Sequence, residues 1–499
     1  MCALAAALSP ASHGYYGWQC SGNTPTVSVC SWSGVYCDYY YNTVYYISLS
    51  QSNLVGSIPT AIGLLTSLNY LILEGNYLTG TLPPSLGKLS QLSYLSIFSN
   101  SLHGSLPTTF SKLTNLNTLL AHENIFTGTI PSWLSQLSQL QSLYCFDNSM
   151  VGTIPSALGS LTKLQALGFG NSLSGTIPTV LGRLSSVTIL SLRGSLTGTI
   201  PGTLSQLSGL QRLHLEQNLL SGSIPSYLGK LSALSDVDLS ENQLVGSIPT
   251  NLYKLTSLTS LMLFENKIVG TISSSIGLLT NLQGLGLGNC MSGTIPSILG
   301  ALSSLTLLGI TGKSVTGSIP SSIGQLTQLS LLYLFGTGIS KSIPASLGSL
   351  SHLVILDLSD NSLTGSIPNC LSKLTSLQEM ELHSNRLVGT IPLSFIKLGS
   401  LVTLDLYSNS LTGSVPSLLC SLSQLSIINL FYNSFYCYSS CLTSKYLFYA
   451  GPISSCSGSP AAAPYSTPST VLSPSSPTAT GNTNQGTVCR MLLLPLFLF

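Results

Sequence analysis

The stretch "LDLSDNSLTGSIP", residues 356–368, returns with small changes along most of the chain. It reads "LILEGNYLTGTLP" at 71–83 and "LDLYSNSLTGSVP" at 404–416. Apolar and polar residues alternate at its start, which is the period of a strand that buries one face. Asn, Gly and Pro then favour turns. The stretch therefore predicts a short strand, a turn and a return segment, repeated many times.

The repeat has a nearly constant length. The glycine of the pattern G-[ST]-[ILV]-P recurs every 24 residues, with three steps of 23, and Lys341 replaces it in one copy. A fixed period of this size with L-x-x-L-x-L-x-x-N-x-L indicates a leucine-rich-repeat solenoid, in which coils stack because one coil cannot bury its leucines alone. We predict a right-handed α/β solenoid with a parallel sheet on its concave face and short helical or 3₁₀ segments on its convex face.

The full repeat is L-x-x-L-x-x-L-x-L-x-x-N-x-L-x-G-[ST]-I-P-x-x-L-G-x-L over roughly residues 15–445. It resembles the plant-type leucine-rich repeats of receptor-like kinase and receptor-like protein ectodomains and of polygalacturonase inhibitors. "CSWSGVYC" at 30–37 resembles the amino-terminal cap of such ectodomains, where the pair equivalent to Cys30 and Cys37 is disulfide-bonded. The first residues resemble the short helix that precedes this cap. The resemblance implies an extracellular module that receives a ligand on its concave sheet.

We divide the chain into five segments. They are an N-terminal cysteine-containing cap without a clear signal peptide (1–43), a solenoid of about 17 coils of 23–24 residues (44–436), a C-terminal cysteine-containing cap (437–456), a Ser/Thr/Pro-rich disordered stalk (457–488) and a short hydrophobic tail (489–499). The stalk has the composition of O-glycosylated segments. The tail is too short to cross a bilayer as a helix, so we expect a GPI-type signal or a truncated membrane anchor.

Cysteines gather at both ends of the repeats. Cys2 and Cys20 are candidates for a second N-terminal bridge, and four more surround the last coil, namely Cys420, Cys437, Cys441 and Cys456. Such clusters predict an oxidising compartment, so we expect the protein outside the cell or at its surface. Three cysteines stand singly inside the repeats, and we expect them to be buried small hydrophobic residues. These are Cys145, Cys290 and Cys370.

The composition argues against several function classes. Only 6% of the residues are charged and the net charge is +2, so nucleic acid is not an expected partner. The chain has no nucleophile elbow, P-loop or H-E-x-x-H motif, and no convincing metal-ligand spacing. An open sheet also cannot exclude water from a reaction. We therefore predict no enzyme activity, no cofactor and no metal site.

The charged residues divide between the two faces of the predicted solenoid. Thirteen of the fourteen acidic residues fall on the variable positions beside the strand leucines, which should face the concave side. Many basic residues instead occupy the convex half of the repeat. An acidic concave face favours a basic partner.

Three acids, Asp357, Glu381 and Asp405, hold the same strand position on consecutive coils, and we call them the acidic row. They should stand about 5 Å apart, which is unfavourable unless a cation or a basic side chain of a partner binds there. Aromatic residues on the same face offer further contacts. The predicted ligand-binding residues are Asp357, Asp360, Glu379, Glu381, His383, Asp405, Tyr407, Tyr333 and Phe335.

A second group of charged residues, which we call the mixed patch, precedes the acidic row. It consists of Arg212, His214, Glu216, Asp236, Asp238 and Glu241. Arg212 should lie beside Asp236, and His214 beside Asp238, on adjacent strands. We therefore expect this patch to neutralise itself.

We interpret the chain as a receptor-like recognition module that binds a peptide, protein or oligosaccharide, with a basic ligand favoured. No kinase signature follows the repeats, so signalling would need a partner such as a co-receptor kinase. The alternative is a structural or adhesive cell-wall or surface protein, in which repetition itself is the function. A smaller alternative is ice binding through the Ser or Thr that follows the glycine of the G-[ST]-[ILV]-P pattern, which we call the marker glycine. A receptor should concentrate unusual residues on neighbouring coils, as 357–407 does.

Overall fold

The structure is a computed structural model that describes residues 1–10, 18–22, 24–40, 43–170, 172–288, 290–445, 447–449 and 454–455. The chain separates into a unit at Met1–Cys456, described below, and a unit at Ser457–Phe499. The expectations for the stalk, the hydrophobic tail and Cys456 lie outside the described residues.

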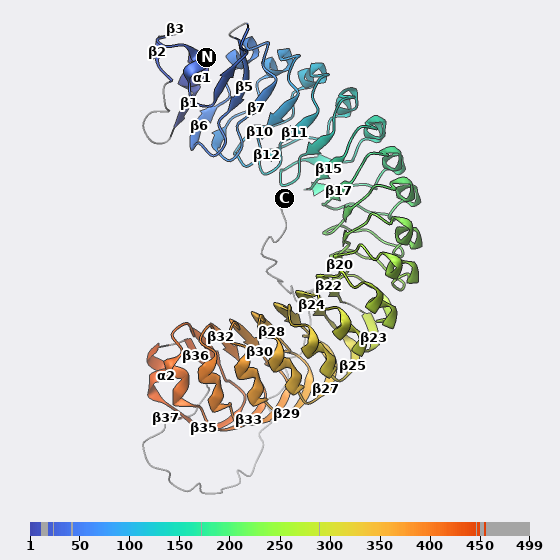
Figure 1. Ribbon diagram of the computed structural model, residues 1–499, viewed down its shortest axis with the longest axis vertical. Helices are drawn as coiled ribbons and strands as arrows, with labels where there is room; N and C mark the ends of the chain where they lie inside the picture. The colour runs from blue at the N-terminus through green and yellow to red at the C-terminus, as the bar shows by residue number, and fades with distance from the viewer. Residues whose placement is uncertain are drawn as a thin grey trace, which may run out of the picture. The chain divides into compact units, whose positions relative to one another are not determined.

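The strand part of each repeat joins one long sheet. Its first strands, β4 (Val35–Cys37) and β5 (Val44–Ser48), pair antiparallel, and from β5 onward each strand pairs parallel with the strand of the next coil. Figure 1 shows these strands on the inner side of the curve that the coils follow. The further strands are β7 (Tyr70–Ile72), β9 (Tyr94–Ser96), β11 (Thr118–Leu120), β13 (Ser142–Tyr144), β15 (Ala166–Phe169), β17 (Ile189–Leu192), β18 (Arg212–His214), β19 (Asp236–Asp238), β20 (Ser260–Met262), β22 (Gly284–Leu287), β24 (Leu307–Ile310), β26 (Leu331–Tyr333), β28 (Ile355–Asp357), β30 (Glu379–Glu381), β32 (Thr403–Asp405), β34 (Ile427–Asn429) and β36 (Leu447–Tyr449).

The return segment of each coil is a 3₁₀ helix on the opposite side of the core (Figure 1). It begins after the repeat proline, as at Pro368, whose φ of −69° suits the turn into the helix. The 3₁₀ helices are η1 (Val29–Ser31), η2 (Thr60–Leu64), η3 (Pro84–Lys88), η4 (Thr108–Lys112), η5 (Ser132–Gln136), η6 (Ser156–Ser160), η7 (Thr179–Arg183), η8 (Gly202–Gln206), η9 (Ser226–Lys230), η10 (Thr250–Lys254), η11 (Ser274–Leu278), η12 (Ser297–Ala301), η13 (Ser321–Gln325), η14 (Ala345–Ser349), η15 (Asn369–Lys373), η16 (Leu393–Lys397) and η17 (Ser417–Ser421).

The core between these two layers is continuous from cap to cap. Leu356 and Leu358, the strand leucines of the stretch quoted above, are both fully buried, and their equivalents repeat in every coil. The predicted leucine-rich-repeat solenoid is therefore confirmed. Because the strand leucines and their equivalents enter this one core, the residues between them are left on the sheet surface.

The marker glycines lie on a flank between the sheet and the 3₁₀ helices, where short strands pair parallel across most coils. Hydroxyls of the residue before the glycine reach the preceding coil, as Thr197 Oγ1 donates to Gly175 O at 3.1 Å. The flank strands are β1 (Leu8–Pro10), β6 (Leu54–Ser57), β8 (Tyr77–Thr79), β10 (His103–Gly104), β12 (Ile125–Phe126), β14 (Val151–Gly152), β16 (Ser172–Leu173), β21 (Val269–Thr271), β23 (Cys290–Thr294), β25 (Gly312–Gly317), β27 (Thr337–Lys341), β29 (Ser362–Ser366), β31 (Arg386–Gly389), β33 (Ser410–Ser414), β35 (Ser434–Tyr438) and β37 (Ser454–Ser455).

Lys341 stands at the marker position with a φ of 68°, where the other copies have glycine. This conformation is costly for a residue with a Cβ, so Lys341→Gly is expected to raise the free energy of unfolding by roughly 0.5–1 kcal/mol. Lys313→Gly is the matched control, since Lys313 lies in β25 without a positive φ and should lose a similar amount. Urea unfolding of both variants measures the difference. Equal destabilisation by the two glycines would contradict this account of the marker position.

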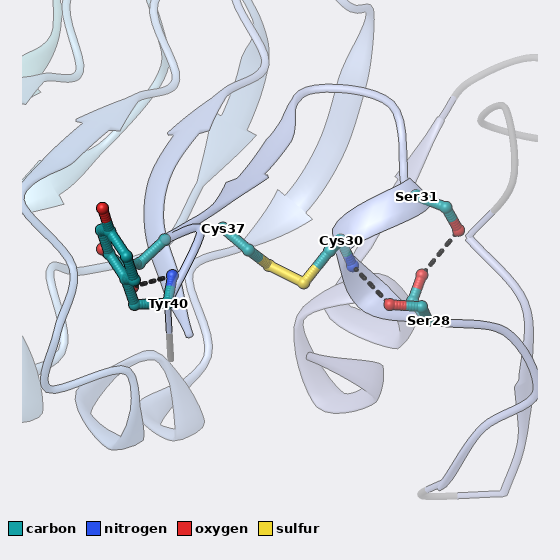
Figure 2. Close-up of a disulfide and its surroundings, with 6 residues drawn as sticks. Ser28, Cys30, Ser31, Cys37 and Tyr40 are labelled. Atoms are coloured by element: carbon teal, nitrogen blue, oxygen red, sulfur yellow. Dashed lines mark hydrogen bonds between the residues drawn. A yellow bond between two sulfur atoms is a disulfide. The ribbon is translucent and has the colours of Figure 1, made fainter. Parts of the chain in front are cut away.

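Disulfides close both ends of the core. Cys30 in η1 is bonded to Cys37 in β4, with Cα atoms 5.4 Å apart, and Figure 2 shows this bridge beside the turn at Ser28. At the same end α1 (Cys2–Ala7) is tied through Cys2 to Cys20, which begins a hairpin of β2 (Cys20–Ser21) and β3 (Thr24–Pro25). At the other end Cys420 is bonded to Cys441 of α2 (Ser440–Lys445).

The single cysteines differ from the expectation that all three are buried. Cys145 is buried, Cys370 is partly buried, and Cys290 is exposed. The physical reason is position: Cys145 holds a core position of its strand segment, whereas Cys290 begins β23 on the flank.

Candidate ligand-binding face

The acidic row forms as predicted in register. β28, β30 and β32 pair parallel, so that Asp357 lies opposite Glu381 and Glu381 lies opposite Asp405. Strand neighbours in a sheet are about 4.8 Å apart. The three carboxylates therefore share one line on the inner face of the sheet.

The two outer carboxylates of the row have donors of their own. Asp357 Oδ1 accepts from the backbone nitrogen and hydroxyl of Ser359, at 3.0 and 2.6 Å. Asp405 accepts from the backbone nitrogen of Tyr407 at 2.9 Å and from Nδ2 of Asn429 at 3.0 Å. Such bonds stabilise a carboxylate in its charged form.

The central carboxylate, Glu381, is distinguished by its pKa. Burial, followed by the charges of Asp405, Asp357 and Glu379, raises its pKa to about 8. Burial also raises the pKa of Asp357, against the effect of its bonds from Ser359. At neutral pH the row therefore holds a proton on Glu381, and a cation beside it would displace that proton.

Aromatic rings lie beside the acidic row. Tyr333 of β26 lies opposite Asp357 in the same line, and its ring makes an edge contact with Phe335 at 6.5 Å. Burial, Glu379 and Asp357 raise the pKa of Tyr333 to about 12. Two residues beyond Glu381 and Asp405, His383 lies 6.4 Å from Tyr407, measured between ring centroids. Carboxylates beside aromatic rings suit an ammonium or guanidinium group, because both attract a cation.

Two further predicted residues lie at the edge of this face. Asp360 is exposed and adopts a φ of 52° in the turn after β28. Glu379 is exposed on β30, two residues before Glu381 on the same strand face. The structure thus brings Asp357, Glu379, Glu381 and Asp405 together and places Asp360 beside them.

Two acids of the mixed patch pair with basic side chains, and these pairs differ from the ones predicted. Register places Arg212 opposite Asp236 and His214 opposite Asp238, as expected. However, His214 Nε2 bonds diagonally to Asp236 Oδ2 at 2.8 Å. Asp238 turns away, since its Oδ1 accepts from the backbone nitrogen and hydroxyl of Ser240.

Arg193 is the charged residue of this patch that the sequence reasoning missed. Its Nε pairs with Oε1 of Glu216, which is 6% exposed. Arg193 follows the strand leucine Leu192, as Glu216 follows Leu215 one coil later. That shared position could have identified Arg193 as a neighbour of Glu216. The coil of Arg193 is one residue short, however, so the two residues are 23 and not 24 apart.

The ionisation of the mixed patch follows from these contacts. Burial, and next the charge of Glu216, raise the pKa of Asp238 to about 6. Burial opposes the charged form of His214, but its bond to Asp236 raises its pKa overall. The same bond lowers the pKa of Asp236 despite burial. Glu216 and Asp236 are thus paired with basic side chains, whereas Asp238 is held by Ser240.

Rings stack on the coils before the mixed patch. His122 lies between Phe98 and Phe146, with ring centroids 4.4 and 4.5 Å away. Burial lowers the pKa of His122 to about 4, so the ring is neutral. Tyr144 borders the stack and contacts Phe146 edge-on at 5.7 Å. This end of the face thus carries stacked rings, with Glu123 and Asp147 next to them in the sequence.

Metal-binding clusters and membrane-spanning helices are two further features to consider in the described ranges. No group of three or more His, Cys, Asp or Glu side chains there is arranged to hold a metal ion. Across the same residues, no helix is long and apolar enough to cross a membrane.

Comparison with known proteins identifies the family of the repeat. The family model described as "Leucine-rich repeat region" matches residues 49–172, and two further leucine-rich-repeat models match residues 341–387 and residues 209–231 and 400–422. The Arabidopsis receptor kinase HAESA, solved with the peptide hormone IDA and the co-receptor SERK1, is 32% identical. That match covers 87% of this chain and 81% of the HAESA chain, with a TM-score of 0.69. The chain belongs to the leucine-rich-repeat family.

This leucine-rich-repeat protein is also similar to other solved structures. The ectodomain of GASSHO1/SCHENGEN3 from Arabidopsis thaliana, solved with CASPARIAN STRIP INTEGRITY FACTOR 2, is 29% identical with a TM-score of 0.56. This match covers 84% of the present chain and 62% of that ectodomain. A leucine-rich-repeat protein of Leptospira interrogans, LIC12759, is 29% identical over 77% of this chain and 95% of its own, with a TM-score of 0.58. A search of curated protein sequences finds no match.

Proposed function

We propose that this leucine-rich-repeat protein is an extracellular or cell-surface recognition module that binds a peptide along the inner face of its sheet. It carries no enzyme activity of its own, and a co-receptor kinase supplies signalling. The similarity to HAESA, whose structure holds a peptide hormone and a co-receptor, supports this class of ligand and partner. Disulfides at both ends of the core support an extracellular location.

The observation that carries the proposal is the acidic row. Its three carboxylates lie in register, and both ion pairs found within the described residues belong to the mixed patch instead. A basic side chain of the peptide would contact Asp357 and Asp405 and replace the proton of Glu381. The rings of Tyr333 and Tyr407 would contact its apolar stem. A ligand bound in this way gains charge-assisted hydrogen bonds.

The distribution of the acids also favours recognition over a purely structural role. A structural or adhesive wall protein needs only uniform coils. Here the carboxylates of one patch are paired locally, and those of the other are stacked without a basic side chain in the same strand line. Like charges side by side on neighbouring strands cost stability. A ligand site explains why the chain carries them there, whereas a uniform scaffold does not.

The double variant Glu381→Gln with Asp405→Asn tests the proposal. We expect it to weaken binding of basic peptides by about tenfold, because it removes charge-assisted bonds that are each worth about 1.5 kcal/mol or more. Fluorescein-labelled synthetic peptides of about 14 residues, each a neutral sequence with one Lys or Arg inserted, serve as probes in an anisotropy titration of the full chain.

The matched control is Glu241→Gln, which removes a carboxylate from the mixed patch and should leave basic peptides bound as before. Neutral peptides should respond to neither change. If basic and neutral peptides bind the parent protein equally well, or if the double variant binds basic peptides unchanged, the acidic row is not the ligand site.

A further inference from the structure

We propose that Asp147, Arg193 and Gln217 form a seat for a carboxamide group, such as the side chain of Asn or Gln in a peptide. The proposal rests on the proposed function in taking a peptide as the ligand, and it adds a second contact point several coils away from the acidic row. The seat is a cavity of about 220 Å³, lined by Asp147, Gly170, Arg193, Gly194 and Gln217.

Glycine creates the space at this place. In the strand line of Arg193, the preceding coils carry Gly170 and then Phe146. A Cβ atom on Gly170 would lie 3.0 Å from Cβ of Phe146 and 3.4 Å from Cβ of Arg193. Both distances are tighter than an ordinary Cβ contact, so position 170 favours glycine, whose bare backbone lines the gap that the cavity forms beside Arg193.

The polar groups around the gap have unused hydrogen-bonding capacity of two kinds. Arg193 uses Nε for Glu216, so its terminal nitrogens remain as donors. Gln217 donates Nε2 to Glu241 Oε1 at 3.3 Å, so its carbonyl oxygen remains as an acceptor. Asp147 is exposed and, as a carboxylate, is an acceptor only. The gap thus offers two acceptors and one set of donors.

A carboxamide matches this set. Its NH₂ group has two hydrogens to donate, to Asp147 and Gln217, and its carbonyl oxygen accepts from Arg193. Charge excludes the nearest competitors: Glu216 already balances Arg193, so Asp147 leaves the seat with one negative charge. A carboxylate would be repelled by Asp147, and it could not donate to Gln217.

The test uses small probes without a basic group. N-acetyl-asparagine methylamide, N-acetyl-aspartate methylamide and N-acetyl-leucine methylamide are titrated into the full chain at pH 7 by saturation-transfer NMR. We expect the asparagine probe to bind about fivefold or more tightly than either of the others, since only it satisfies all three side chains.

Asp147→Asn is the informative variant. Asp147 has a φ of 50°, a conformation that Asn adopts readily, so the fold is preserved while an acceptor becomes partly a donor. The preference for the asparagine probe should fall to about twofold or less. Glu265→Gln is the matched control, because Glu265 occupies the same turn position with a φ of 51° and lies several coils further along the solenoid. Gly170→Ala, which fills the floor without changing charge, should also abolish the preference.

The proposal is overturned if the aspartate or leucine probe binds as well as the asparagine probe. It is equally overturned if Asp147→Asn and Glu265→Gln have the same effect. Since none of the probes is basic, these results are independent of the response of basic peptides to the change at Glu381 and Asp405. Loss of the seat alone therefore leaves the proposed function standing.

Discussion

Replacing Asn242 by alanine is expected to lower the free energy of unfolding by about 3 kcal/mol, because buried backbone groups lose their partners. Asn242 is 8% exposed. Its Nδ2 donates to the carbonyl oxygens of Leu215, Leu239 and Ser240, at 2.8, 3.2 and 2.9 Å. Its Oδ1 accepts from the backbone nitrogen of Leu220 at 3.0 Å.

The loss is not equal among these groups. Leu239 O also accepts from Nδ2 of Asn266, and Leu215 O from Nδ2 of Asn218, so both carbonyls keep one partner. The buried nitrogen of Leu220 has no such substitute. We therefore expect most of the cost at Leu220, with faster amide exchange there than at equivalent positions of other coils.

Thr337→Ala is the matched control, since Thr337 occupies the asparagine position in its own coil. Its hydroxyl contacts Asn361 Oδ1 and the carbonyl oxygen of Leu334, which Asn361 Nδ2 also reaches. The cost should be about 1 kcal/mol. Urea unfolding midpoints compare the two variants. Equal midpoints would show that asparagine occurs at this repeat position only because it favours the turn, and that its side-chain hydrogen bonds do not stabilise the solenoid.

The strict period explains how much of this fold was predictable. Because the coils around the acidic row all have 24 residues, residues 24 apart lie opposite each other there, and the row followed directly from the positions of Asp357, Glu381 and Asp405. The burial of the leucines and the 3₁₀ return segments follow from the same repetition.

The side-chain contacts were less predictable, because register does not determine rotamers. His214 had two aspartates within reach, and it bonds to Asp236 because Ser240 already holds Asp238. The cavity beside Arg193 was also missed. It depends on Gly170, one small residue in a coil that is one residue short, and not on any repeated feature.

The same register that builds the acidic row predicts how stability depends on pH. The pKa of Glu381 rises from an ordinary 4.5 to about 8 in the folded protein. Between these two values the folded state keeps a proton that the unfolded state has released. The contribution of this group to the free energy of unfolding should therefore be fully present below pH 4.5, and it should be lost as the pH rises through 8.

Glu381→Gln removes this dependence, because glutamine has the shape of protonated glutamate and never ionises. Glu381 is only partly shielded from solvent, so screening reduces the effect to on the order of 2 kcal/mol. We expect the variant to equal the parent near pH 4.5 and to exceed it in stability by that amount at pH 8.5. Urea unfolding at both pH values measures the difference, with Glu241→Gln as the control that keeps the parent's slope. Parallel pH profiles for the parent and Glu381→Gln would mean that the three carboxylates do not repel one another, and the argument for a cationic ligand would lose its physical basis.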